Sequence, residues 1–161
     1  GGNYVFNTED QLVITTANDG SIVKSTTGLG VIKRGEGLRM TIGGQFSSVT
    51  DAAGIVLNFN YIGIDAAAAE ANSAIDSWTI PQSTAADRFK IEITLTLDSA
   101  TDNFGYVYEV RTNDGLNESV ISNYTSMPPL ATYSNVGLEL SATVNGTDQI
   151  IFHSVVFEHL R

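Results

Sequence analysis

The chain has 161 residues, no cysteine, and 18 acidic against 8 basic residues, which give a formal net charge of −10. This length suits one domain with a core of its own, and the lack of cysteine excludes disulfides, thiol nucleophiles and cysteine-based zinc sites. An acidic surface repels phosphate backbones and no run of 18 apolar residues is present, so we expect neither a nucleic-acid partner nor membrane insertion.

The N-terminal part of the chain carries two short strand patterns separated by turn residues. The chain begins with Gly1-Gly2 instead of methionine, which we interpret as the start of a trimmed or processed product. Leu12–Thr15 and Ser21–Lys24 then flank Asn18-Asp19-Gly20, and such residues tolerate the positive φ of tight hairpins. We predict a single domain over the whole chain, in which residues 1–34 could instead form an N-terminal extension or attachment segment.

The middle of the chain shows the period-two alternation of half-buried strands. It appears at Leu38–Ile42 and Leu57–Tyr61, is longest at Phe89–Leu97, and returns over Phe104–Val110 and Val136–Leu140. Sheets with one dry face and one wet face are usually antiparallel. About 8–10 strands at such spacings predict an all-β protein, either an antiparallel β-sandwich or a barrel.

One segment between two strands departs from this rhythm. Residues 65–72 are rich in alanine, which has the highest helix propensity of all residues. We therefore predict one or two turns of helix there, as a surface excursion of the all-β domain.

The last run, Ile150 to Leu160, is apolar on both of its faces. A strand of this kind belongs at the centre of a sheet or at a subunit interface. For the second case, the interface residues would be Phe152, His153, Val155 and Phe157.

The sequence offers little for catalysis or for cofactor and metal binding. His153 and His159 lie on one strand without a third metal ligand nearby, and polar positions on a surface strand explain them better. Glu92 and Glu109 could pair on one sheet face as the two carboxylates of a glycosidase, but Lys90 and Arg111 flank them as on an ordinary solvated sheet. The acid-rich loops fit turns better than a calcium site. We therefore expect a protein that is not an enzyme and that holds no cofactor or metal.

Aromatic residues are the best candidates for a sugar-binding surface, because pyranose rings stack on them. Trp78 is the only tryptophan, and Tyr106 and Tyr108 lie on a later strand. A single tryptophan in a strand is more often a core residue than a binding platform. We nevertheless take Trp78, Tyr106 and Tyr108 as the ligand-surface candidates.

The order of several motifs resembles a known protein family. Glu36-Gly37-Leu38-Arg39-Met40-Thr41-Ile42-Gly43-Gly44 is followed by Asn60-Tyr61-Ile62-Gly63, a tryptophan, the long strand Phe89–Leu97, and a closing pair over 136–144 and 150–160. This succession is similar to the jelly-roll domains of tailed-bacteriophage virion proteins, namely tail-fibre or spike tips and head-decoration or head-fibre proteins, which are like tumour necrosis factor in fold. It covers about residues 35–161.

The resemblance implies a jelly-roll sandwich, a homotrimer and a place on the virion surface, with other virion proteins or a host-surface glycan as partners. It implies no catalytic residue. Our leading hypothesis is a phage structural module that decorates the capsid or forms a fibre tip. The alternatives are a carbohydrate-binding module of a secreted polysaccharide-active enzyme and a sandwich hydrolase that uses Glu92 and Glu109.

Overall fold

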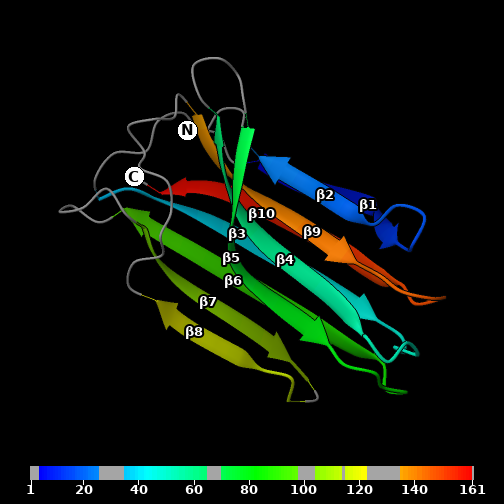
Figure 1. Cartoon of the computed structure of the whole chain (residues 1–161). Helices are drawn as coiled ribbons and strands as arrows, with labels where there is room; N and C mark the ends of the chain where they lie inside the picture. Colours follow the sequence, from blue (N-terminus) through cyan, green and yellow to red (C-terminus); the bar gives the residue numbers. More distant parts are fainter. Residues whose placement is uncertain are drawn as a thin grey trace.

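The chain folds into two antiparallel β-sheets that face each other (Figure 1). The computed structural model describes residues 4–25, 35–64, 70–97, 104–113, 115–122 and 135–160, and within these ranges it contains ten strands and no helix. The six-stranded sheet consists, in spatial order, of β1 (Tyr4–Ile14), β10 (Ile150–Leu160), β3 (Gly37–Phe46), β6 (Asp87–Leu97), β7 (Phe104–Thr112) and β8 (Glu118–Ser122). The four-stranded sheet consists of β2 (Gly20–Ser25), β9 (Asn135–Thr143), β4 (Ile55–Ile64) and β5 (Glu70–Ile80).

The chain crosses repeatedly between the two sheets. Each of β1, β2, β3, β5, β8 and β9 is followed along the chain by a strand of the opposite sheet. This winding confirms the predicted all-β, antiparallel sandwich of jelly-roll type. None of the described residues forms a helix long and apolar enough to cross a membrane.

The core lies between the sheets and consists of alternate residues of the strands. Phe59 and Trp78 of the four-stranded sheet meet Tyr108 and Phe89 of the other sheet, with ring centroids 5.5 and 5.3 Å apart. Phe89 also meets Phe152 edge-on at 6.2 Å. The predicted alternation is confirmed on β6, where Phe89, Ile91, Ile93 and Leu95 are buried and Lys90 is exposed.

The described part of the alanine-rich segment, residues 70–72, forms a strand and not the predicted helix. Residues 65–69 lie outside the described residues, whereas residues 70–72 begin β5. There, Glu70, Ala71 and Asn72 pair with Ile64, Gly63 and Ile62 of β4. The helix prediction is therefore wrong for residues 70–72, because cross-strand pairing outweighs the weak intrinsic preference of alanine.

The apolar strand β10 lies inside the six-stranded sheet, between β1 and β3. Phe152, Val155 and Phe157 are 0 % exposed because they point into the core of the same chain. This corrects the predicted subunit interface, since these three side chains are already covered. His153 is half-buried and lies where the register of β10 with β3 shifts, between Phe152 and Ser154.

A buried carboxylate joins two loops at one end of the sandwich. Asp148 is 3 % exposed, and its Oδ1 accepts hydrogen bonds from the Thr50 backbone N at 2.8 Å and from the Thr50 hydroxyl at 2.7 Å. Its Oδ2 accepts a third hydrogen bond from the Asp51 backbone N at 3.0 Å. Burial by itself raises the pKa of Asp148, but these hydrogen bonds outweigh it and hold the pKa below its ordinary value of 3.8.

Replacing Asp148 with asparagine is expected to lower the free energy of unfolding by about 2 kcal/mol at pH 7, because a charged acceptor of three hydrogen bonds is lost. A depressed pKa means that the carboxylate stabilises the fold above its unfolded pKa of about 3.9, and that this contribution disappears as the pH falls further. The difference between wild type and D148N, measured by urea denaturation, should therefore shrink below about pH 4. A difference that stays constant down to pH 2.5 would contradict this role.

Candidate functional site

The three aromatic residues predicted to form a ligand surface are part of the core. Trp78 is 1 % exposed, Tyr108 0 % and Tyr106 9 %. The Tyr106 hydroxyl donates a hydrogen bond to Asp76 Oδ2 at 3.2 Å, and the Tyr108 hydroxyl donates one to Glu118 Oε2 at 3.4 Å. The prediction of a sugar-stacking surface from these residues is therefore wrong. For Tyr106 and Tyr108, the sequence signal for a core position was their shared parity with Val110 on β7, which is also buried.

The two tyrosine hydroxyls lie near carboxylates at the margin of the core. Burial raises the pKa of Tyr108 far above its ordinary value, and the nearby carboxylates of Glu118 and Asp76 raise it further. This raised pKa keeps the Tyr108 hydroxyl protonated at neutral and mildly alkaline pH. This hydroxyl can donate a hydrogen bond, but it cannot act as a base.

The two histidines lie on β10 in different surroundings. His159 Nε2 lies 2.6 Å from Glu36 Oε2, and the His159 side chain is 4 % exposed. His159 pairs with Leu38 of β3, six residues away from the irregular position of His153 along β10. Among the described residues, no group of three or more His, Asp or Glu side chains could hold a metal ion. One of the acid-rich loops considered above for calcium, over residues 98–103, lies outside the described residues.

Polar side chains line the solvent-facing side of the six-stranded sheet, which we call the outer face. We define the outer face by ten outward residues of three adjacent inner strands, namely Arg39, Thr41, Gly43 and Gln45 of β3, Arg88, Lys90, Glu92 and Thr94 of β6, and Glu109 and Arg111 of β7. The exposed Val107 of β7, paired with Thr94, lies on the same side. The register places these outward residues in rows across the sheet. Gly43, Lys90 and Arg111 form one row, and Thr41, Glu92 and Glu109 form the next.

The two candidate carboxylates are direct cross-strand neighbours. Glu92 pairs with Glu109 across β6 and β7. The sequence alone did not show whether these two carboxylates lie side by side. Glu109 Oε1 accepts a hydrogen bond from Arg111 Nε at 2.7 Å. This hydrogen bond, with the nearby charges of Arg111 and Lys90, lowers the pKa of Glu109. A glycosidase general acid needs a raised pKa, so the environment of Glu109 does not suit that role.

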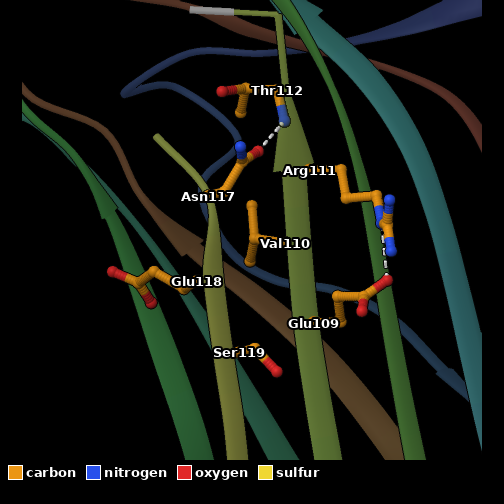
Figure 2. Close-up of a pocket in the computed structure, with 7 residues that line it drawn as sticks. All are labelled: Glu109, Val110, Arg111, Thr112, Asn117, Glu118 and Ser119. Atoms are coloured by element: carbon orange, nitrogen blue, oxygen red, sulfur yellow. Dashed lines mark hydrogen bonds and ion pairs between the residues drawn. The ribbon is translucent and has the colours of Figure 1, made fainter. Parts of the chain in front are cut away.

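Two open pockets adjoin each other at the end of the outer face where β6, β7 and β8 approach their loops. One, of about 340 Å³, is lined by residues 109–112 and 117–119. The other, of about 360 Å³, is lined by residues 88–90 and 111–113, so the two pockets share Arg111 and Thr112. Figure 2 shows Glu109 and Arg111 extending together from one side of β7, while Glu118 extends the other way from β8.

The turn between β7 and β8 is fixed by side chains that border these pockets. The Thr112 backbone N donates a hydrogen bond to Asn117 Oδ1 at 2.7 Å (Figure 2). The Leu116 backbone N donates one to the Thr112 hydroxyl at 2.9 Å. These contacts hold the pocket wall in place without a bound ligand.

Comparison with known proteins finds similar solved structures but no related sequence. No family model matches the chain, and no curated protein sequence does. Among solved structures, the chain is similar to peanut lectin in complex with a 9-residue peptide, at 11% identity and a TM-score of 0.47, over 99% of this chain and 98% of that chain. It is also similar to the metal-free form of lectin I-B4 from Griffonia simplicifolia, at 9% identity and a TM-score of 0.46, over 100% of both chains.

A third similar structure is that of infectious bursal disease virus, strain Gt, at 14% identity and a TM-score of 0.30, over 98% of this chain and 32% of that chain. At these identities and TM-scores, the likenesses are confined to the sandwich architecture and assign no ligand to this chain. None of the three is a bacteriophage protein or a tumour necrosis factor. The resemblance to bacteriophage virion proteins therefore stays a proposal.

Proposed function

We propose that this chain is a non-enzymatic binding module, which holds a carbohydrate polymer across the outer face of its six-stranded sheet. The observation that carries the proposal is the outer face itself, where hydroxyl, carboxylate, amide and cationic side chains stand in rows beside two open pockets. Such groups can donate and accept hydrogen bonds to sugar hydroxyls. An open surface, unlike a closed pocket, admits a ligand that is longer than the site.

The face also suits binding better than hydrolysis. Its paired carboxylates are Glu92 and Glu109, and Glu109 is held ionised by Arg111 and Lys90. Because an ionised carboxylate cannot protonate a leaving oxygen, Glu109 can only accept hydrogen bonds. In a hydrolase, Glu92 would then have to be the general acid. Its partner carboxylate, Glu109, already accepts a hydrogen bond from Arg111.

The absence of cysteine allows a sharp test, because a single introduced thiol can be labelled alone. Thr94 faces outward on β6, and Thr79 faces outward on β5 of the other sheet. Affinity electrophoresis in gels containing xylan, laminarin, alginate or polygalacturonate would measure retardation of T94C and T79C, each coupled to a polyethylene-glycol maleimide. We expect wild type and labelled T79C to be retarded by at least one polysaccharide, and labelled T94C to lose that retardation.

If labelled T94C is still retarded, the polysaccharide binds somewhere other than the outer face. No retardation of wild type in any gel would overturn the proposal. Release of reducing sugar by wild type, abolished in E92Q, would replace the binding module by an enzyme.

A homotrimeric virion module, as a capsid-decoration protein or fibre tip, is the second candidate. It is favoured by the motif order, because Leu38-Arg39-Met40 lies in β3, Tyr61-Ile62-Gly63 in β4, and the closing pair forms β9 and β10. Light scattering coupled to size exclusion would give about 52 kDa for a trimer, three times the 17.2 kDa of one chain. A monomer at micromolar concentration would contradict this candidate without affecting the binding proposal.

A further inference from the structure

The cations of this acidic protein are unevenly distributed. The described residues include five Lys or Arg side chains, at positions 24, 39, 88, 90 and 111. Three of them, Arg88, Lys90 and Arg111, line the same pocket of about 360 Å³ at the end of the outer face. We call these three residues the basic cluster.

The sheet register brings the basic cluster together. Lys90 of β6 is paired directly with Arg111 of β7, and Arg88 lies two residues before Lys90 on the same side of β6. Like charges directly opposite each other on a sheet are destabilising. The fold therefore tolerates repulsion between Lys90 and Arg111. A carboxylate could take either position, because the next row of the same face holds Glu92 and Glu109.

The positive charge of the basic cluster is neutralised only in part within the described residues, by Glu109, which lies near Arg111 and Lys90. Arg111 pairs with Glu109, but the side chains of Arg88 and Lys90 make no ion pair within the part of the chain that the structure describes. Both residues are exposed. By contrast, Arg39 at the far end of the outer face is held by Glu158, with two hydrogen bonds of 2.9 Å.

The neighbouring groups leave room for a ligand beside these cations. Gly43 of β3 is paired with Lys90, so no side chain separates Lys90 from the half-buried Ser154 of β10. Gln45 is paired with Arg88 and brings an amide to the same edge. Cations beside amide and hydroxyl groups, on an open surface, match a ligand that carries both acidic groups and hydroxyls.

We propose that the basic cluster selects an acidic polysaccharide, one that carries a carboxylate or sulfate on its sugar units, as the ligand of the outer face. This inference rests on the proposed binding function and adds its ligand class. A nucleic acid fits less well, because duplex DNA carries one charge per about 1.7 Å, and the repulsion from a chain with a net charge of −10 grows with the charge density of the ligand. A polysaccharide has a lower charge density, and its hydroxyls can use Glu92 and Glu109 as acceptors.

The test compares two polymers with the same sugar backbone, namely polygalacturonate, whose carboxylates are charged, and its fully methyl-esterified form, whose ester groups are neutral. Isothermal titration at 0.01 M NaCl should show tighter binding of polygalacturonate by wild type. Lys90→Gln should weaken that binding by about threefold, and Arg88→Gln with Lys90→Gln by about tenfold, as expected for exposed ion pairs. Lys24→Gln is the matched control, since it removes an exposed lysine from β2 of the other sheet and should leave the affinity unchanged.

Salt gives an independent readout. The Debye length falls from about 30 Å at 0.01 M to about 3 Å at 1 M salt, so the preference for polygalacturonate should disappear in wild type at 1 M NaCl. The double variant should show little salt dependence.

The outcomes separate this inference from the proposed function. Equal binding of both polymers, unchanged in the double variant, would overturn the acidic-ligand inference and leave the binding module standing. No binding to either polymer or to the neutral polysaccharides would overturn both. Displacement of bound polygalacturonate by an equal charge concentration of duplex DNA would also overturn the inference, because the cluster would then not distinguish sugars from phosphates.

Discussion

Replacing Trp78 with alanine is expected to lower the free energy of unfolding by about 3–5 kcal/mol, the usual cost of removing a buried aromatic ring. Trp78 is 1 % exposed and is the largest fully buried side chain among the described residues. Its ring packs against Phe89 of the opposite sheet, with centroids 5.3 Å apart and planes tilted by 60°. The substitution therefore leaves a cavity where the two sheets are held together.

Urea denaturation followed by far-UV circular dichroism would measure this loss. Thr79→Ala is the control, because Thr79 is the exposed neighbour of Trp78 on β5 and surface substitutions usually change stability by no more than about 0.5 kcal/mol. A loss below about 1 kcal/mol for Trp78→Ala would mean that this ring does not lie in the core. It would also restore Trp78 as a ligand-surface candidate.

Replacing Gly54 with alanine is expected to lower the free energy of unfolding by about 3 kcal/mol, because two separate costs add. The first is backbone strain, since Gly54 has a φ of 73° in a turn that its backbone N closes by donating to Asp51 O at 3.0 Å. The second is a steric clash, since a Cβ at Gly54 would meet the carbonyl oxygen of Ile80. A backbone atom cannot move away as a flexible side chain can.

Gly115→Ala isolates the first cost. Gly115 also has a positive φ, of 84°, but a Cβ there would meet no atom within 4 Å. Its alanine variant should therefore lose only about 1–2 kcal/mol, and the difference between the two variants measures the clash. Equal losses in thermal or urea denaturation would show that the contact with Ile80 costs nothing.

The strands themselves could be predicted from the sequence because their determinants are local. The alternation on β6 and β7 fixes which side chains face inward, and Tyr106, Tyr108 and Val110 follow it. The same rule predicts burial of Tyr106 and Tyr108, which conflicts with their assignment to a sugar-binding surface. The two-sided apolar pattern of β10 correctly predicted a strand inside a sheet, whereas its assignment to a subunit interface ignored the half of its residues that face the core.

The candidate site could be predicted only in part, because it depends on strand order. The sequence placed Lys90 and Glu92 on the outward side of one strand, and Glu109 and Arg111 on that of another. It could not show that these strands are neighbours in a register that pairs Lys90 with Arg111 and Glu92 with Glu109. Pairing between sheet strands is set by packing over the whole domain, so the basic cluster and its adjoining pockets became visible only in three dimensions.

The position of β10 has a consequence for biosynthesis. This strand comes last along the sandwich but fills the gap between β1 and β3, where Val156 pairs with Val5 and with Thr41. Until residues 150–160 have left the ribosome, β1 has no neighbour in its sheet and one edge of β3 stays open. Contacts so distant in sequence slow folding, and open strand edges invite aggregation. We therefore expect nascent chains that stop before residue 150 to need a chaperone, and the domain to acquire protease resistance only after its final strand has been synthesised.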